Sequence, residues 1–435
     1  VQKAFVVDRK GEPLMPCHPA RARQLLREKR AVVHRRAPFT IRLKNREGGE
    51  VQPVRLKIDP GSRVTGMALV REDGNKAEVL HLAELHHRRG ISKRMKQRRQ
   101  YRRRRRSANL RYRPPRFLNR AASRRKGKLA PSLLSRVNHI ESWVRRYRGM
   151  GPVAAISVEL ARFDMQKMEN AEIKGVEYQQ GTLHGYDVWE YLLEKWGRMC
   201  AYCGTENVPL EKEHIVPRSR RGSDRVSNLT VSCHECNQRK NNQTAKEFGH
   251  PEVEAQALQP LRDAAAVNST RWATYRVLAA TGLPVEVGTG SRTKYNRVRL
   301  ALPKTHALDA LCVGGSTPER VAGLEGTVVL VIGARGRGQY SRTSVDRYGF
   351  PRGYRTRKKL MYGFRTGDLV EAVVPRGKYA GRHAGVAVVR RSGYFDIKQN
   401  GTRVAQGISW RHFNALQRFD GYGYERGRAA LEPHG

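Results

Sequence analysis

The stretch CAYCGTENVPLEKEHIVPRSRRGSDRVSNLTVSCHECNQRKNN, residues 200–242, decides how this sequence is interpreted. It carries two Cys-x-x-Cys pairs about thirty residues apart. Two such knuckles suit a tetrahedral zinc site built from four thiolates. We therefore expect a closed, structural Zn²⁺ that clamps the two ends of the module, held by Cys200, Cys203, Cys233 and Cys236.

Between the knuckles lies the sequence Glu-His-Ile-Val-Pro, residues 213–217. A neutral imidazole can take a proton from water, so we predict that His214 is a general base. Carboxylate and amide oxygens suit a hard cation, so Glu213 and Asn237 are predicted to hold one Mg²⁺. A histidine beside a zinc knuckle is more often structural, but here the four cysteines already fill the zinc site. His234, inside the second knuckle, is assigned to the fold.

The pattern C-x-x-C…EHI-x-P…N-L…C-x-x-C-N resembles the HNH (ββα-metal) nuclease family. The resemblance implies that Asn228 orients the hairpin that bears His214 and that Asn237 is a metal ligand. Many members of that family have Asp where this chain has Glu213.

The composition is strongly basic. Lys and Arg total 85 against 39 acidic residues, a formal net charge of +46, and 39% of the residues are hydrophobic. A compact chain with this excess repels itself unless a polyanion such as nucleic acid neutralises it. A ribosomal or chromatin-type basic protein would have the same composition. A length of 435 residues allows about two to four domains.

Residues 88–128 contain 20 Lys or Arg among 41 residues and no acid. Arg and Lys favour helices, so we predict one exposed basic helix that ends before Pro114. A disordered basic tail is the alternative. Contacts to nucleic acid are expected from Arg98, Arg99, Arg102, Arg103, Arg104, Arg105 and Arg106.

Three further acids and a histidine are spread over the chain. Asp59 ends the first strand of an expected hairpin at 54–70, and Glu159 ends a buried-type strand. His306 and Asp309 lie three residues apart, on one face of an expected helix at 304–314. Carboxylates placed in this way can converge on two Mg²⁺ ions, held by Asp59, Glu159 and Asp309.

The order of these residues resembles the split RuvC domain, of RNase H fold, in RNA-guided nucleases. Asp59 matches the first motif, Glu159 the second, and His306 with Asp309 the third. The basic helix and the cysteine module occupy the places of the bridge helix and the HNH insertion. Together with PLMP at 13–16, this order resembles the IscB family of transposon-associated RNA-guided nucleases.

The resemblance implies an α/β multidomain chain, with an RNase H-like mixed sheet, an inserted HNH domain, an Arg-rich bridge helix and a small C-terminal β domain. The expected segments are a PLMP-type N-terminal domain at 1–50, RuvC parts at 51–87, 129–185 and 251–322, a bridge helix and basic linker at 88–128, HNH at 186–250, and a β domain binding a target-adjacent motif at 323–435.

Smaller features complete the expected layout. PLMP is expected to be a rigid turn, and residues 288–297 a basic loop. Cys17 and Cys312 are expected to be small buried apolar residues. The C-terminal β domain could instead be a plain RNA-binding barrel.

The function implied by the resemblance is RNA-guided cleavage of double-stranded DNA by a monomeric ribonucleoprotein. A long structured guide RNA would select the target; HNH would cut the guide-paired strand and RuvC the displaced strand. Alternatives are a protein-guided homing or restriction endonuclease, a junction resolvase, and a non-catalytic RNA-binding zinc protein. The sequence has neither a membrane span nor the apolar core of a signal peptide, so a cytoplasmic location is expected.

Overall fold

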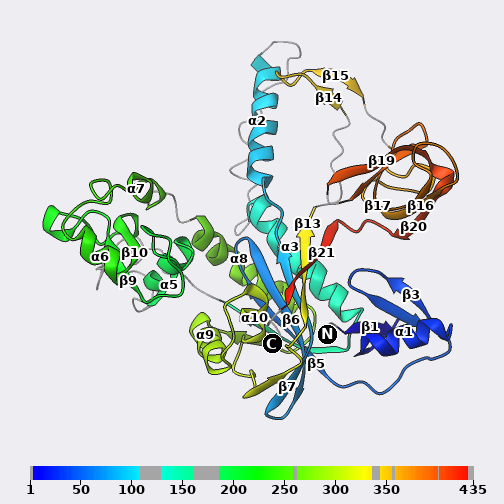
Figure 1. The fold of residues 1–435 in the computed structure, drawn as a ribbon, viewed down its shortest axis with the longest axis horizontal. Coiled ribbons are helices and arrows are strands. Elements are labelled where there is room, and N and C mark those ends of the chain that lie inside the picture. Colours follow the sequence, from blue (N-terminus) through cyan, green and yellow to red (C-terminus); the bar gives the residue numbers. More distant parts are fainter. Residues whose placement is uncertain are drawn as a thin grey trace. The chain divides into compact units, whose positions relative to one another are not determined.

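The computed structural model describes residues 3–107, 129–160, 186–257, 262–335, 343–354, 358–399 and 401–429. The expected basic linker 108–128, residues 161–185 of the second RuvC part, and Asn400 lie outside the described residues. The fold is mixed α/β with several sheets (Figure 1). The chain divides into two compact units, one formed by Val1–Glu159 with Ala273–Gly435 and the other by Leu160–Trp272. Among the described helices, none is long and apolar enough to cross a membrane.

The main sheet of the first unit has eight strands in the order β11-β8-β5-β6-β7-β13-β21, with β12 also paired to β7. Strands β5, β6 and β7 form an antiparallel meander. Strand β8 pairs in parallel with β5, and β11 pairs in parallel with β8. The strands are β5 (Val54–Pro60), β6 (Val64–Asp73), β7 (Lys76–His86), β8 (Val153–Glu159), β11 (Val285–Gly288), β12 (Arg320–Ala322), β13 (Val328–Ala334) and β21 (Tyr422–Ala429).

Helices cover both faces of this sheet. On β7, the His81 ring donates to or accepts from the Tyr147 hydroxyl of α3 (Pro131–Arg148) at 3.1 Å. The next residue, Leu82, belongs to the hydrophobic cluster around α10 (His306–Leu311). Since successive strand residues point to opposite faces, α3 and α10 lie on opposite sides of the sheet.

The N-terminal segment forms its own four-stranded sheet in the order β2-β1-β4-β3, packed against α1 (Pro19–Arg27). Its strands are β1 (Ala4–Val7), β2 (Pro13–Cys17), β3 (Ala31–Arg35) and β4 (Thr40–Leu43). The expected PLMP turn is wrong, because these residues form most of β2. That strand lies at the sheet edge, where prolines without an N–H are tolerated.

The expected C-terminal β segment is divided between two sheets. Strands β13 and β21 join the main sheet, whereas five others form a separate sheet in the order β19-β18-β17-β16-β20. That sheet consists of β16 (Leu369–Val374), β17 (Gly381–Val388), β18 (Tyr394–Gln399), β19 (Thr402–Ser409) and β20 (Phe413–Gln417). A short hairpin, β14 (Thr343–Val345) and β15 (Pro351–Tyr354), lies between β13 and β16 in sequence. Local sequence indicates a strand but not which sheet it joins.

The expected basic loop at 288–297 is also wrong, because most of it is helical. Helix α9 (Gly290–Arg299) begins after Thr289, whose side chain accepts a hydrogen bond from the Arg292 backbone N–H. This N-cap starts a helix in a stretch that was expected to be a loop.

The second unit contains a two-stranded antiparallel hairpin, β9 (Leu210–His214) and β10 (Leu229–Cys233), followed directly by α6 (His234–Lys240). Its other described helices include α5 (Tyr186–Lys195), α7 (Pro251–Ala257) and the first part of α8 (Arg262–Ala279). Leu192, Trp196, Leu229 and Val231 are buried in a core of its own. The hairpin and α6 together form a ββα unit.

Candidate functional site

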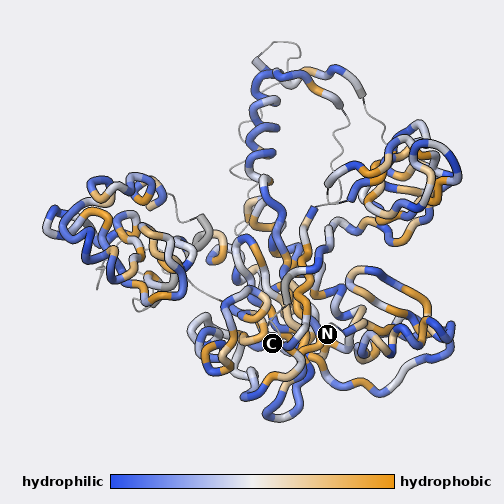
Figure 2. Tube along the Cα trace, in the orientation of Figure 1, coloured by the Kyte–Doolittle hydropathy of each residue, from blue (hydrophilic) through white to orange (hydrophobic). Residues whose placement is uncertain are grey.

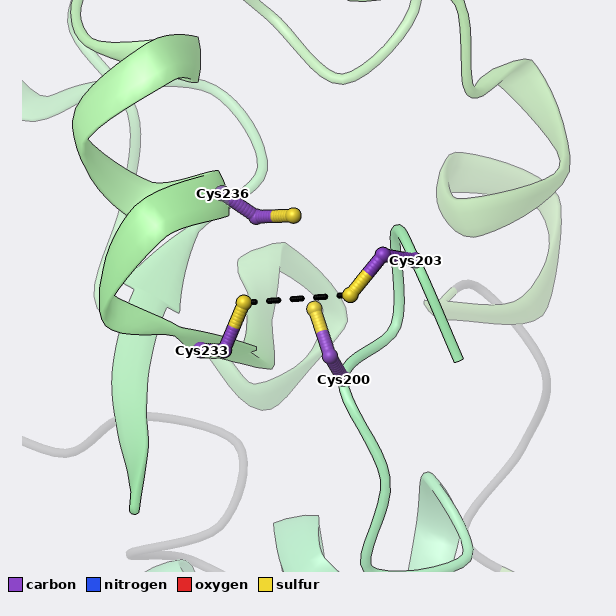
Figure 3. Close-up of side chains that lie close together, drawn as sticks. All are labelled: Cys200, Cys203, Cys233 and Cys236. Atoms are coloured by element: carbon purple, nitrogen blue, oxygen red, sulfur yellow. Dashed lines mark hydrogen bonds between the residues drawn. The ribbon is translucent and has the colours of Figure 1, made fainter. Parts of the chain in front are cut away.

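The four cysteines predicted from the sequence lie together in the second unit (Figure 3). Their sulfur atoms all lie within 4.8 Å of one another. Four sulfurs each about 2.3 Å from a tetrahedral zinc would be about 3.8 Å apart. Cys203 Sγ and Cys233 Sγ are separated by 3.8 Å. The donor set therefore fits a structural zinc.

His214 ends β9 and is held by a carboxylate that the sequence analysis missed. Its Nε2 donates to Asp224 Oδ1 at 2.6 Å, and both side chains are largely buried. The Arg218 guanidinium also donates to Asp224 Oδ1, at 2.6 and 2.9 Å. With Nε2 committed as a donor, Nδ1 is the ring atom that can accept a proton. Asp224 thus orients the ring and fixes its tautomer.

Asn228 holds both ends of the loop between the two strands. Its Oδ1 accepts from the Val216 N–H at 2.8 Å, and its Nδ2 donates to the carbonyls of Val216 and Ser223 at 2.9 and 2.8 Å. Val216 comes two residues after His214, and Ser223 comes just before Asp224. Asn228 therefore ties together the two chain segments that carry His214 and Asp224.

Glu213 lies in a different environment from His214, because adjacent residues of a strand point to opposite faces. Its side chain is buried, and its two carboxylate oxygens accept from Lys240 Nζ and Tyr202 Oη, each at 2.6 Å. Burial and the adjacent carboxylate raise the pKa of Tyr202, which keeps its hydroxyl as a donor. Lys240 also donates to the His214 carbonyl at 2.9 Å.

Asn237, the other predicted magnesium ligand of this module, has other neighbours. Its Nδ2 donates to Glu211 Oε2 at 2.6 Å, while His234 Nδ1 lies 2.9 Å from Glu211 Oε1. These hydrogen bonds lower the pKa of Glu211. Glu213 and Asn237 therefore have separate polar partners in this structure. His234 lies on the exposed surface of the module.

The first two acids of the predicted RuvC-like set lie at neighbouring strand ends. Asp59 is the penultimate residue of β5, and Glu159 is the last residue of β8. The two strands are parallel, with Ile58 opposite Val158 in the register. Because adjacent strands are about 4.8 Å apart, this register brings both carboxylates to one sheet edge. Carboxylates are the ligands that Mg²⁺ takes from proteins, so this edge fits a magnesium site.

Helix α10 brings His306 to the same edge. His306 Nδ1 lies 3.9 Å from Asp59 Oδ2. This approach depends on Gly66 of β6, which is paired with Asp59. A Cβ at position 66 would lie 1.7 Å from the His306 carbonyl oxygen, so any side chain there would push α10 off the sheet. The glycine in the sequence VTGMALV was a signal that the sequence analysis did not use.

Helix α9 contacts two members of the predicted set, Glu159 and Asp309. We call the set of Asp59, Glu159, His306 and Asp309 the acidic centre. A Cβ at Gly290 would lie 3.3 Å from Glu159 Oε1. Arg297 Nε lies 2.9 Å from Asp309 Oδ1, and both side chains are 14% exposed. Arg297 is a second residue that the sequence analysis missed, because residues 288–297 were expected to form a loop.

The predicted basic helix is present as α2 (Ile91–Ser107), and it has no buried residue. Figure 2 shows it as hydrophilic along its length. All the arginines predicted to contact nucleic acid are exposed on it: Arg98, Arg99, Arg102, Arg103, Arg104, Arg105 and Arg106. Because α2 has no apolar face, packing it against the rest of the protein would give no hydrophobic stabilisation. Its positive charge suits a polyanionic partner.

Two protein families match parts of the chain. Residues 4–181 match the model described as RRXRR protein, and residues 200–251 match the model of HNH endonucleases. No curated protein matches the chain.

Solved structures that resemble the chain include the type II-C Cas9 enzyme from Actinomyces naeslundii, at 15% identity and a TM-score of 0.23, covering 60% of this chain and 59% of that one. Streptococcus thermophilus Cas9 in complex with the AGAA PAM has 14% identity and a TM-score of 0.21, covering 60% of this chain and 32% of that one. The chain thus aligns with 59% or less of the length of these proteins. It is similar to HNH endonucleases over its cysteine module and to RRXRR proteins over most of the segment before it.

Proposed function

We propose that this protein is an RNA-guided double-strand DNA endonuclease of the IscB type with two nuclease centres. The observation that carries the proposal is the His214–Asp224 pair, on a ββα hairpin beside four clustered cysteines, within a segment that matches HNH endonucleases. A neutral imidazole oriented by a carboxylate is suited to take a proton from water that attacks a phosphodiester. This centre would cut the guide-paired strand.

The second centre proposed is RuvC-like, and it would cut the displaced strand. Its support is the mixed sheet whose parallel edge carries Asp59 and Glu159, with His306 and Asp309 on the helix that packs against it. These carboxylates would hold Mg²⁺, which when bound activates water and stabilises the departing oxygen. His306, 3.9 Å from Asp59, can hold or pass a proton there. Arg297 balances the charge of Asp309.

Metal roles differ between the two centres. The four cysteines would hold a structural zinc, for which their sulfur spacing is suited. At the HNH centre, Mg²⁺ on Glu213 and Asn237 was expected, but Glu213 is paired with Lys240 and Asn237 with Glu211. The proton transfer at this centre is assigned to His214, oriented by Asp224.

The partners proposed are a long structured guide RNA and double-stranded DNA, bound by a monomeric protein. The formal charge of +46 and the exposed arginines of α2 support a polyanionic partner. The five-stranded sheet β16–β20 is the part we propose to read a motif beside the target.

A plasmid-nicking assay tests the whole proposal. Wild type, Asp59→Ala, His214→Ala and the double variant would be purified with RNA transcribed beside the gene and given supercoiled target plasmid in Mg²⁺. We expect Asp59→Ala to nick only the guide-paired strand and His214→Ala to nick only the displaced strand. The double variant should cut neither strand. Ribonuclease treatment should abolish cleavage. Double-strand cleavage by Asp59→Ala without RNA would instead indicate a protein-guided HNH endonuclease.

A further inference from the structure

The tip of the β14–β15 hairpin is docked on helix α2. In the turn between the two strands, Asp346 Oδ1 accepts hydrogen bonds from the backbone N–H groups of Tyr348 and Phe350, each at 2.9 Å. Gly349 of the same turn has a φ of +93°, and a Cβ built on it would lie 2.8 Å from the Cβ of Tyr101 on α2. Because glycine has no side chain and tolerates this φ, the turn can lie directly on the helix.

Two arginines share the ring of Tyr348 at this contact. The Arg347 guanidinium lies 4.6 Å from the centre of the ring, and the guanidinium of Arg104, on α2, lies 5.7 Å from it. Both distances are within the limit of about 6 Å for a cation–π contact. Tyr348 is nevertheless 44% exposed. The tertiary fold thus gathers two positive charges around one exposed ring, and an anion bound beside them would offset their repulsion.

A pocket of about 490 Å³ lies at this contact, lined by α2 and by the hairpin tip. Ligand pockets in proteins typically have volumes of about 300–1,000 Å³. No carboxylate is among the described residues that line this one. The lining includes arginine, glutamine and tyrosine side chains: Gln97, Gln100, Tyr101, Arg103, Arg104 and Arg347. Its chemistry therefore favours an anion that also carries hydrogen-bonding groups.

This lining suits one unpaired nucleotide. Guanidinium groups donate paired hydrogen bonds to a phosphate. The side-chain amides of Gln97 and Gln100 can both donate to and accept from the edge of a base. Unstacked bases of RNA loops and bulges stack on aromatic rings and on arginine planes. A paired base hides both its faces and its edge, so the ligand is a nucleotide that has left its helix.

We propose, resting on the RNA-guided function proposed above, that the pocket between α2 and the β14–β15 tip binds one extruded nucleotide of the guide RNA. Its phosphate lies on the arginines and its base lies against Tyr348. In a guided nuclease the DNA sequence changes with each target, whereas the structured part of the RNA stays constant. Amides that hydrogen-bond the edge of a base suit a nucleotide whose identity does not vary, which favours the RNA over the DNA.

The affinity of the full chain for labelled RNA transcribed beside its gene tests this site. Tyr348→Ala should raise the Kd roughly 5- to 150-fold in filter binding, which corresponds to the loss of about 1–3 kcal/mol for one base-stacking contact. Tyr348→Phe keeps the ring and should bind nearly as the wild type does. Tyr295→Ala is the matched control, because Tyr295 is 57% exposed and has the Arg292 guanidinium 5.4 Å from its ring centre, but lies on α9 outside this pocket.

A second variant displaces the hairpin tip and leaves every side chain that lines the pocket in the sequence. Gly349→Ala places a Cβ against Tyr101 at a φ that alanine rarely adopts, so it should lift the tip from α2 and weaken RNA binding as Tyr348→Ala does. Gly353→Ala, in the same hairpin, is its control, because a Cβ there meets no atom within 4 Å.

Chemical probing of the bound RNA gives a readout that a general loss of structure would not reproduce. In the wild-type complex one unpaired nucleotide should be protected, and in Tyr348→Ala that nucleotide alone should become reactive. An RNA that lacks this nucleotide should bind the wild type more weakly. It should bind Tyr348→Ala with no further loss, since the two deletions remove the same contact.

Wild-type RNA affinity in Tyr348→Ala, or a change in reactivity spread evenly over the RNA, would overturn the proposal. Unchanged RNA binding together with weaker capture of target DNA would assign the pocket to DNA, and would overturn it as well. A wild-type chain that binds no RNA and cleaves without it would instead refute the guided function itself.

Discussion

Replacing Glu213 by Gln separates two roles that the structure and the sequence assign to this residue. The carboxylate chemistry of the sequence predicts that Glu213 is a magnesium ligand, whereas the structure pairs it with Lys240, whose side chain is completely buried. Gln keeps the shape and the hydrogen-bonding oxygen but removes the charge. If the pair with Lys240 is its main role, the variant leaves a buried ammonium without its counter-ion.

The expected cost follows from that burial. Removing one partner of a buried ion pair destabilises a protein by about 3–5 kcal/mol. Because the Gln oxygen and the His214 carbonyl can still accept from Lys240, we expect about 3 kcal/mol, which is roughly a 150-fold change in an opening equilibrium. Adding Lys240→Met to Glu213→Gln removes the stranded charge and should restore much of the stability.

Hydrogen exchange measured by mass spectrometry on the full chain reports this locally. Amides of β9 and β10 should exchange about two decades faster in Glu213→Gln. Glu211→Gln is the matched control, because Glu211 is on the same face of the same strand but its side chain is 40% exposed. Its effect should stay below about 1 kcal/mol. Unchanged exchange in Glu213→Gln together with lost Mg²⁺-dependent cleavage would refute the structural role.

Four further predictions follow from the contacts described. Asp224→Asn should slow cutting of the guide-paired strand about 100-fold or more, with the displaced strand cut normally, in a cleavage assay with each strand separately labelled. A zinc chelator should speed hydrogen exchange in the β9–β10 hairpin and release one zinc ion per chain, as measured by atomic absorption. A purified chain without bound zinc would contradict the four-cysteine site. Gly66→Ala should abolish displaced-strand cutting by shifting α10, whereas Gly353→Ala, where a Cβ meets no atom within 4 Å, should not. Burial lowers the pKa of Lys57 from 10.5 to about 8. Between these pH values the unfolded chain binds more protons than the folded one, so the free energy of unfolding rises with pH. Lys57→Met should lose that rise when urea unfolding is compared at pH 8 and pH 10.

Several parts of the fold and site were predictable because their information is local. The two Cys-x-x-Cys pairs predicted a four-sulfur cluster, and the structure brings those sulfurs together. Runs such as VRLKIDP and VTGMALV predicted the β5–β6 hairpin, since apolar residues and a Gly-rich turn act over a few residues. The acid-free basic stretch predicted helix α2 for the same reason.

Other features depended on contacts between segments far apart in the sequence. Whether PLMP is a turn or an edge strand depends on whether β1 lies beside it. The run TVVLVI, residues 327–332, falls in the segment expected to form a C-terminal β domain. Strand β13, which contains most of it, instead joins the main sheet, because β7 and β21 both pair with it. Strand propensity depends on the neighbours a strand finds, and local sequence does not contain them.

The groups available for chemistry can be read directly from the chain: four thiolates, a histidine beside a carboxylate, acids at strand ends, and a large excess of positive charge. Which of these groups meet depends on the tertiary fold. It paired His214 with Asp224, and it turned Glu213 toward Lys240 because successive strand residues face opposite ways. It also brought His306 to Asp59 across a glycine, since two backbones approach closely only where no side chain stands between them.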